Sequence, residues 1–302
     1  MQQEFYSNGK LLISGEYAIL DGAKGLAVPT KFGQSLITAP TQKEFISWKS
    51  LDVDGQVWFT AELQPKNLVI EKSSDDQIVK TLQQILLEAK KLNPNFLDSK
   101  LGLEIETQLT FPREWGLGTS STLINNIAQW AAVDAHQLLW NSFGGSGYDI
   151  SCAQNDSPIL YHIKNNLPKV EQINFQPEFK DVIYFVYLNQ KQSSKKAITN
   201  YRSKIFNRKE FISKINEISI KMASKQSIEE FGYLVEAHEA LLSKILEIPT
   251  IKEKLFSDYF GTVKSLGAWG GDFAMAIGNE KTPEYFKSKG FETILSFKEM
   301  VL

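Results

Sequence analysis

The sequence predicts an α+β protein with two domains. The chain has 302 residues, which is more than a single hydrophobic core usually serves. Strand-like and helix-like hydrophobic patterns follow each other irregularly, without the regular strand–helix alternation of a parallel α/β sheet. A strand-like stretch at residues 181–188 is followed by long helical patterns, and we interpret it as the start of a second half. We therefore place one boundary near residue 170, with an N-terminal domain over residues 1–170 and a C-terminal domain over residues 171–302.

The N-terminal part contains the clearest strand pattern and an amphipathic helix. Residues 101–111 alternate apolar and polar side chains, as a strand does when one face is buried and the other meets water. This pattern favours an antiparallel or mixed sheet. Residues 78–92 place apolar side chains at helical spacing. The first forty residues read as short strands broken by glycines and a proline: 10–14, 17–20 and 26–30.

Further elements follow the same signals. A helix is expected over residues 123–131, and Asp134 is a fair N-cap for a short helix after it. Beyond residue 170 the sequence predicts a strand, two long helices, a glycine-rich turn and a last strand: 181–188, 209–224, 228–247, 267–271 and 273–278.

Composition and charge favour an ordinary globular protein. The net charge is −2, which gives no general attraction to nucleic acid or to an anionic membrane. Cys152 is the only cysteine, so the sequence predicts neither an internal disulfide nor a cysteine metal cluster. The first residues lack a signal-peptide pattern, and the longest apolar run, 182–188, is too short to span a bilayer. We expect a cytoplasmic protein, and a homodimer is left open.

Residues 114–123, EWGLGTSSTL, place loop glycines and a cluster of hydroxyls directly before a helical pattern. The first amide groups of a helix lack partners within the helix and carry partial positive charge, so a glycine loop there can bind phosphate. An ordinary loop with a Ser/Thr cap explains the same residues. A Walker loop is excluded because no lysine precedes the hydroxyls, and a dinucleotide fingerprint would need a glycine at Ser121.

Three segments, in order, resemble the GHMP kinases, a superfamily that includes galactokinase, homoserine kinase, mevalonate kinase and phosphomevalonate kinase. Pro112 with Gly116–Ser121 resembles the central phosphate loop of the family. Residues 8–20, NGKLLISGEYAIL, resemble its opening motif, and residues 264–272, KSLGAWGGD, resemble its closing motif. Residues 144–150, GGSGYDI, are similar to the segment with the catalytic aspartate, in the form of the subgroup named for Gly-Tyr-Asp-Ile-Ala.

The resemblance implies a fold and an activity. The fold would combine an N-terminal domain like domain 2 of ribosomal protein S5 with a ferredoxin-like C-terminal domain. The activity would be ATP-dependent phosphorylation of a small molecule with Mg²⁺. Among the better-known members, phosphomevalonate kinase is the most similar in local detail. It too tends to have an aromatic residue before the loop glycines, as Trp115 does here, together with a GEYAVL opening and Gly-Gly-Asp in the closing motif. Mevalonate kinase is the alternative, and a catalytically silent sensor that binds ATP or another ligand is a further one.

The resemblance also implies roles for individual residues. The nucleotide phosphates would bind at Gly116, Leu117, Gly118, Thr119, Ser120 and Ser121, with the Ser120 hydroxyl on the metal ion. Asp149 would orient or deprotonate the acceptor hydroxyl, and Lys10 would neutralise charge beside it. The acceptor would contact Glu16, Tyr17, Ser146, Gly147, Ser193, Ser194, Lys195, Gly267 and Ala268.

Several features depart from the family or have a second interpretation. The interval between Ser120 and Asp149 is short, and the glutamate that usually completes the Mg²⁺ site has no counterpart. Trp269 replaces a glycine of the closing motif, which would narrow a ligand pocket. Asp149 also suits the cap of a helix over residues 150–154. Lys191, Lys195, Lys196 and Arg202 offer cations for a phosphorylated acceptor, or simply form a solvated basic loop.

Overall fold

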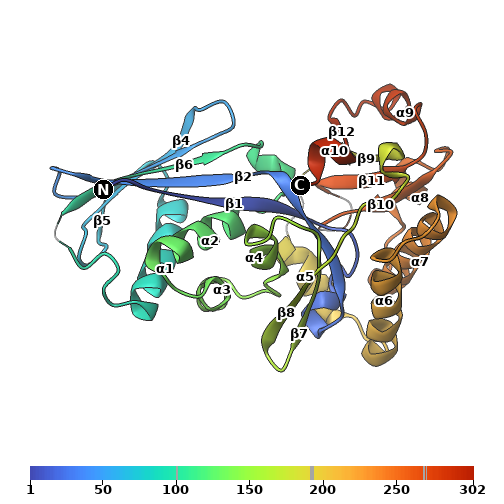
Figure 1. Ribbon diagram of the computed structural model, residues 1–302, viewed down its shortest axis with the longest axis horizontal. Helices are drawn as coiled ribbons and strands as arrows, with labels where there is room; N and C mark the ends of the chain where they lie inside the picture. Colours follow the sequence, from blue (N-terminus) through green and yellow to red (C-terminus); the bar gives the residue numbers. More distant parts are fainter. Residues whose placement is uncertain (100, 191–193, 268, 270) are drawn as a thin grey trace. The chain divides into compact units, whose positions relative to one another are not determined.

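The computed structural model describes residues 1–99, 101–190, 194–267, 269 and 271–302, and the chain forms two compact units (Figure 1). Unit 1 comprises Met1–Gly9, Phe32–Arg113 and Leu117–Gln154. Unit 2 comprises Lys10–Lys31, Glu114–Gly116 and Asn155–Leu302. Each unit therefore draws on separate stretches of the chain. The simpler division near residue 170 stays a prediction.

Unit 1 contains a mixed sheet. Strand β6 (Gly102–Leu109) lies between β2 (Gly25–Thr41) and β3 (Ile46–Leu51), antiparallel to β2 and parallel to β3. The sheet continues through β4 (Val57–Leu63) to β5 (Ile70–Ser73), and β1 (Gln3–Leu12) pairs with β2. Both β1 and β2 are long strands whose residues belong partly to unit 1 and partly to unit 2.

Helices pack on this sheet around one apolar core. They are α1 (Asp76–Leu92), α2 (Thr119–Ala131), α3 (Ala135–Ser142) and α4 (Tyr148–Ala153). In Figure 1, α1, α2 and α3 lie on the same face of the sheet. The core joins side chains of the strands, such as Trp48 and Ile105, to helical side chains such as Leu86 and Ile127. Burial of this apolar surface is the main force that holds the helices on the sheet.

Unit 2 contains an antiparallel four-stranded sheet in the order β10-β11-β9-β12. These strands are β9 (Ile183–Tyr187), β10 (Thr262–Ser265), β11 (Phe273–Ile277) and β12 (Ile294–Ser296). Strands β7 (Ile159–Lys164) and β8 (Leu167–Gln172) form an antiparallel hairpin. Strand β7 also pairs antiparallel with residues 25–27 of β2.

The helices of unit 2 include two long ones that pack together, α6 (Arg208–Met222) and α7 (Ile228–Leu246). A capping box starts α7, in which the Ser227 hydroxyl and the Glu230 carboxylate each bind a backbone amide of the other residue. The remaining helices are α5 (Ser194–Ser203), α8 (Ile251–Leu255), α9 (Thr282–Ser288) and α10 (Phe297–Met300), with the 3-10 turns η1 (Ala18–Asp21), η2 (Arg113–Trp115) and η3 (Lys180–Val182) in the chain.

The α+β class and most elements expected from the sequence are confirmed. The helix expected over 78–92 is α1, and Asp134 caps α3 by accepting a hydrogen bond from the Gln137 amide at 2.7 Å. The strand expected over residues 17–20 is wrong, because η1 forms there. Gly15 (φ 95°) and Tyr17 (φ 60°) have left-handed backbone, which turns the chain away from an extended path.

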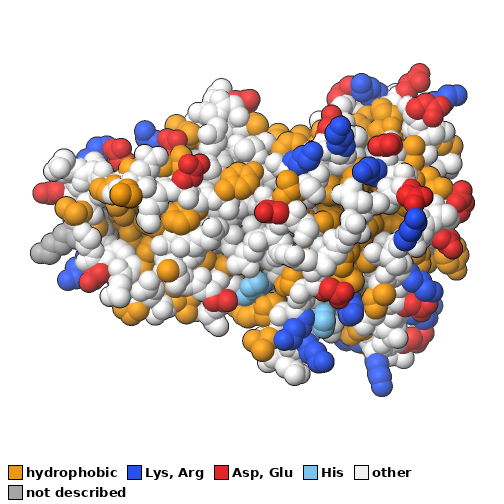
Figure 2. Space-filling model, viewed as in Figure 1, with side chains coloured by type: hydrophobic (Ala, Val, Ile, Leu, Met, Phe, Trp, Pro, Cys, Tyr) orange, Lys and Arg blue, Asp and Glu red, His pale blue; other side chains and the backbone are white. Residues whose placement is uncertain are grey.

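Acidic and basic side chains are interspersed over the face of the molecule in Figure 2. Within the residues that the structure describes, no helix has the length and the apolar character needed to cross a membrane.

Candidate active site

The glycine-rich loop leads directly into helix α2, as expected. Gly116 (φ 67°) and Gly118 (φ 102°) both have left-handed backbone, which glycine adopts without strain. Gly118 is the N-cap of α2, and no side chain in the described structure caps this helix. The Ser121 hydroxyl donates to the Gly118 carbonyl oxygen at 2.8 Å, whereas the Ser120 side chain is exposed. The first turn of α2 thus combines polarised amide groups with an accessible hydroxyl.

A chain of buried polar groups fixes α2 within unit 1. The Thr122 hydroxyl donates to Gln34 Oε1 at 2.8 Å, and Asn126 Nδ2 donates to the Gln34 carbonyl oxygen at 2.9 Å. Ser7 Oγ donates to Asn126 Oδ1 at 2.6 Å and accepts a hydrogen bond from Asn125 at 2.9 Å. Sequence reasoning missed this network, although two adjacent asparagines inside an apolar helical pattern were a visible signal. Buried hydrogen bonds of this kind hold a helix in one position.

Asp149 lies in the first turn of α4, a helix that packs against α2 in the same unit. Its Oδ1 accepts a hydrogen bond from the Ile150 amide at 3.1 Å. The N-cap of α4 is Gly147, with left-handed backbone, so the interpretation of Asp149 as the N-cap is wrong. Ser146 and Gly147 are buried beside it. The half-buried carboxylate at 149 is therefore placed by the helix and by a glycine turn, as a positioned acid or base requires.

His136 lies near this segment. Its Nε2 is 2.9 Å from the Ser151 hydroxyl, and burial lowers the pKa of the imidazole. A neutral imidazole at this place holds α3 and α4 together.

In unit 2, Lys10 binds the start of the glycine loop. Lys10 Nζ donates to the Gly116 carbonyl oxygen at 2.8 Å, which joins two motifs that are 106 positions apart. The preceding residue is anchored as well, because the Trp115 ring meets Phe273 edge-on at 5.5 Å. The Tyr187 hydroxyl donates to the Glu114 carbonyl oxygen at 3.4 Å. The entry to the loop is thus fixed by an ammonium group and by an aromatic contact.

The Asp272 carboxylate lies close to Gly116. A Cβ atom on Gly116 would be 2.5 Å from Asp272 Oδ2 and 2.8 Å from Oδ1, and on Gly267 it would be 3.2 Å from Oδ2. Asp272 itself has left-handed backbone (φ 55°), an uncommon conformation for a residue with a side chain. The glycine at 116 is required for space as well as for conformation. The sequence analysis included Asp272 only as part of the closing motif and did not predict its contact with Gly116.

Glu16 and Tyr17, expected to contact the acceptor, are buried and have protein partners. Glu16 pairs with Lys264, and burial raises the pKa of its carboxyl group despite the opposing effect of that lysine. The Tyr17 hydroxyl accepts a hydrogen bond from the Trp269 amide at 3.0 Å, and its ring stacks on Tyr201 at 5.4 Å. Burial raises the pKa of Tyr17 to about 12, so it stays a neutral phenol. Contact of either residue with an acceptor stays a prediction.

Trp269 and Arg202 both have protein partners in the structure. The Trp269 ring packs against the apolar cluster around Tyr17 and Leu242, and its Nε1 donates to the Pro249 carbonyl oxygen at 3.4 Å. The narrowing of a ligand pocket by Trp269 stays a prediction. Arg202 pairs with Asp21, and Asp21 also accepts a hydrogen bond from the Tyr201 hydroxyl at 2.6 Å. The guanidinium is therefore engaged in anchoring α5 to η1.

The remaining predicted contacts are only partly described. Gly267 has left-handed backbone (φ 75°) directly after Ser265 and Leu266. Ser193 and Ala268 lie outside the described residues, as do the side chains of Ser194 and Lys195.

Ser120 fits a metal ion that arrives with nucleotide phosphates, because Mg²⁺ keeps several waters and needs only one or two protein ligands. No group of three His, Cys, Asp or Glu side chains that could hold a metal ion exists in the described part of the chain. The amides and hydroxyls at the start of α2 suit the phosphates themselves. The predicted residues fall in both units: Ser120 and Asp149 belong to unit 1, and Lys10 and Gly267 to unit 2.

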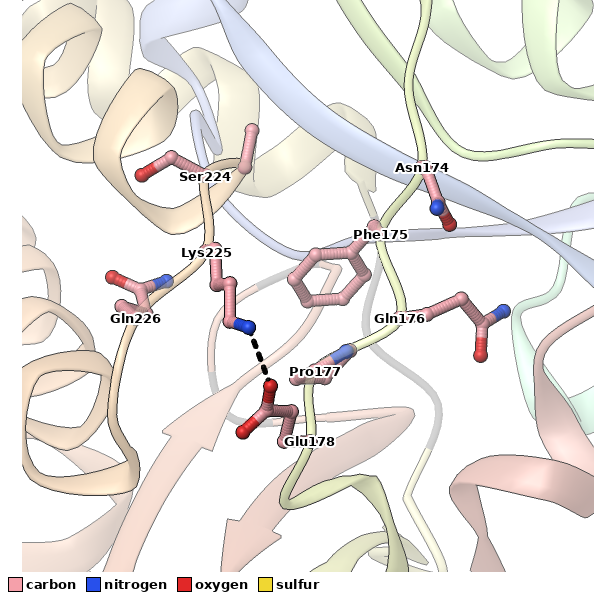
Figure 3. Close-up of a pocket in the computed structure, with 9 residues that line it drawn as sticks. Asn174, Phe175, Gln176, Pro177, Glu178, Ser224, Lys225 and Gln226 are labelled. Atoms are coloured by element: carbon pink, nitrogen blue, oxygen red, sulfur yellow. Dashed lines mark ion pairs between the residues drawn. The ribbon is translucent and has the colours of Figure 1, made fainter.

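A separate surface pocket of about 220 Å³ contains none of these residues. It is lined by residues 174–178 and 223–226 (Figure 3). Its one marked interaction in the figure is an ion pair of Lys225 and Glu178 at 2.7 Å, and both side chains are largely exposed. An exposed ion pair stabilises a protein little. We do not consider this pocket a candidate active site.

Sequence comparison finds no matching family model and no matching curated protein. Solved structures do match over nearly the whole chain. The Methanococcus jannaschii mevalonate kinase is 19% identical, with a TM-score of 0.71 over 98% of this chain and 97% of that protein. The Streptococcus pneumoniae phosphomevalonate kinase, in complex with phosphomevalonate and AMPPNP, is 17% identical, with a TM-score of 0.71 over 97% and 99%.

A third structure, the Lactococcus lactis galactokinase complexed with galactose, is 13% identical, with a TM-score of 0.65 over 95% of this chain and 88% of that protein. All three are GHMP kinases. At these identities the likeness is one of fold, and the fold of this chain is that of the GHMP kinases.

Proposed function

We propose that this chain is an ATP-dependent small-molecule kinase that phosphorylates phosphomevalonate and uses Mg²⁺. The observation that carries the proposal is the start of α2, a 13-residue helix that follows two left-handed glycines and has no side-chain cap in the described structure. Such a helix end favours an anion with several oxygens, as the terminal phosphates of a nucleotide provide. The fold likeness to kinases supports a nucleotide as the source of that anion.

The residues suit phosphoryl transfer, in which the protein mainly positions the reactants and neutralises charge. The first amides of α2 would hold the phosphates, and the exposed Ser120 hydroxyl would be a ligand of Mg²⁺, which neutralises phosphate charge when bound. Lys10 holds the loop entry through the Gly116 carbonyl oxygen and adds positive charge there. Asp149 would orient the acceptor or take its proton.

The choice of acceptor rests on sequence features rather than on fold. Trp115 before the glycines, the GEYAIL opening and Asp272 at the end of the closing motif favour phosphomevalonate. The fold likeness does not separate this acceptor from mevalonate, because the two kinases have the same TM-score. Mevalonate is therefore the second candidate. Either activity would belong to the synthesis of isoprenoid precursors, in the cytoplasm.

The test is Mg²⁺-dependent release of ADP with mevalonate, phosphomevalonate, galactose and homoserine as separate acceptors. Asp149→Asn is compared with wild type on the acceptor that reacts fastest. Asp134→Asn is the matched control, because Asp134 is a carboxylate of the same unit whose role is to cap α3. Nucleotide binding is measured separately by calorimetry.

We expect turnover with phosphomevalonate, unchanged turnover in Asp134→Asn and reduced turnover in Asp149→Asn. A phosphate acceptor is already largely ionised at neutral pH, so the loss in Asp149→Asn is mild for phosphomevalonate. For a hydroxyl acceptor such as mevalonate it reaches about 10²-fold or more. ATP binding without turnover on any acceptor would favour the sensor instead, and absence of ATP binding would refute the nucleotide site.

A further inference from the structure

Unit 2 buries four ionisable side chains in one cluster, which we call the Lys264 cluster. Its members are Glu16, His238, Glu239 and Lys264, none of which is more than 3% exposed. They come from the turn after β1, from α7 and from β10. Burial of charged groups is costly, and apolar residues of similar volume often stabilise a fold at least as well. The cluster therefore calls for a reason beyond stability.

Lys264 is the centre of the cluster. Its Nζ donates to Glu16 Oε1 and to the carbonyl oxygen of Ser265, the latter at 2.9 Å. It also lies 3.7 Å from Glu239 Oε1. The other oxygen of Glu239 accepts a hydrogen bond from the Ser265 amide at 3.2 Å. The ammonium group thus joins Glu16 to the backbone of the strand that leads into Gly267.

His238 completes the connection to the turn. The Gly15 amide donates to His238 Nε2 at 2.9 Å, so this nitrogen acts as an acceptor. Burial, and then Lys264, hold the pKa of the imidazole well below its ordinary value, which agrees with a neutral ring. Gly15 also packs closely against the backbone of β2, because a Cβ there would lie 2.8 Å from the Gly25 Cα atom. The imidazole and the neighbouring strand thus fix Gly15 from two sides.

The charges of the cluster balance only with an additional proton. Two carboxylates face one ammonium group, and burial raises the pKa of both carboxyl groups, that of Glu239 to about 8. Near neutral pH one carboxyl group therefore keeps its proton, and the cluster is neutral as a whole. Hydrogen bonds from such a buried cluster to the backbone, here at Gly15 and Ser265, can hold two segments in position inside a protein.

The segments that it joins both lead into the proposed site. Residues 15–17 follow the strand that carries Lys10, whose ammonium group binds Gly116. Ser265 is two residues before Gly267, which has left-handed backbone, and Asp272 lies close to both Gly267 and Gly116. The Tyr17 hydroxyl and the Trp269 amide, bonded at 3.0 Å, connect the same two segments directly.

We propose that Lys264 is a positioning residue for the phosphoryl transfer, because it fixes the turn at 15–17 against the segment 265–267 through Glu16 and the Ser265 carbonyl oxygen. This inference rests on the proposed function. Lys264 is fully buried and touches neither reactant. Its loss would displace groups at the reacting centre, and a misplacement of about 1 Å can cost about 10²-fold in rate.

The experiment measures acceptor kinetics, nucleotide affinity and folding for three forms of the full chain. Lys264→Met combined with Glu16→Gln removes both charges, so no unpaired charge remains buried. Glu16→Gln alone keeps the shape of the side chain and an acceptor for Lys264. The matched control is Glu236→Gln with Lys252→Met, which removes an ion pair at 3.5 Å between α7 and α8 whose carboxylate is exposed and whose lysine is half-buried.

We expect the Lys264→Met/Glu16→Gln protein to melt close to wild type and to bind nucleotide within about threefold of it, since the amides of α2 belong to unit 1. Its kcat with the acceptor should fall by about tenfold to a hundredfold. The kcat of Glu16→Gln should fall by less, and the kcat of the control should match that of wild type. Loss of kcat with nucleotide affinity retained is not what general destabilisation produces.

Wild-type kcat in the folded double variant would overturn the inference and leave the proposed function intact. If the double variant fails to fold, Glu16→Gln decides in the same way, because unchanged kcat there refutes a positioning role. Absence of turnover in the wild-type chain would overturn the proposed function, and the inference with it.

Discussion

A methyl group on Gly116 would collide with the carboxylate of Asp272, and this collision can be measured. The added Cβ atom would lie 2.5 Å from Oδ2 and 2.8 Å from Oδ1, far inside ordinary contact distance. The backbone of Gly116 is also left-handed (φ 67°), which is unfavourable for alanine. Gly116→Ala therefore tests both the conformation and the packing of the loop entry.

The two effects have separate magnitudes. A left-handed alanine costs roughly 1–2 kcal/mol, and overpacking costs roughly 1–3 kcal/mol. The free energy of unfolding should therefore fall by about 2–5 kcal/mol in Gly116→Ala. Gly290→Ala is the matched control, because Gly290 is in the same unit, is also left-handed (φ 87°) and has nothing within 4 Å of an added Cβ. It should lose only the conformational part, about 1–2 kcal/mol.

Asp272→Ala isolates the collision, because it removes the atoms that the methyl group would meet. In that background Gly116→Ala should cost only about 1–2 kcal/mol, so the double-mutant cycle gives a coupling of about 1–3 kcal/mol. The assay is urea unfolding followed by tryptophan fluorescence, with Trp115 adjacent to the change. Equal losses in Gly116→Ala and Gly290→Ala, or a coupling near zero, would refute the contact between Gly116 and Asp272.

Three further outcomes are expected. Burial raises the pKa of Glu239 from 4.5 to about 8, so the folded protein holds a proton that the unfolded chain releases. The free energy of unfolding, measured with urea, should therefore fall by about 2 kcal/mol between pH 6.5 and 8 in wild type, and by less in Glu239→Gln. This range lies above the ordinary pKa of histidine, because the lowered pKa of His238 has the opposite effect below it. Ser120→Ala should raise the Mg²⁺ concentration for half-maximal ADP release about tenfold, and calorimetry should show weaker Mg²⁺ binding to the nucleotide complex; an unchanged Mg²⁺ titration contradicts its role as a ligand. Ser227→Ala removes half of a capping box and should lower the free energy of unfolding by about 1 kcal/mol, and an unchanged thermal midpoint would contradict that contribution.

Local patterns predicted the local structure well. The periodicity of residues 78–92 gave α1, and glycines followed by hydroxyls gave the start of α2. Residues 17–20 have the same apolar character as a strand, but the left-handed backbone of Gly15 and Tyr17 leads into a 3-10 turn. Side-chain hydrophobicity alone does not report such backbone angles.

Contacts between distant segments were beyond what the sequence could predict. Asp272 against Gly116 and Arg202 on Asp21 depend on how strands and helices pack, and no pattern in the sequence marks them. Trp269 shows the same limit, because its place in the closing motif did not indicate its packing against the apolar cluster around Leu242. The sequence proposed the segments of the candidate site, whereas the contacts of those segments with distant residues are seen only in the structure.

The discontinuous make-up of unit 2 affects how the chain can reach its fold during synthesis. Glu16 leaves the ribosome early, yet its counter-charge, Lys264, is 248 positions later. Until that lysine emerges, the turn after β1 exposes a carboxylate and a tyrosine that the finished protein buries. Unit 2 must therefore assemble after nearly the whole chain has been translated, and a nascent chain that stalls before residue 264 should depend on chaperones.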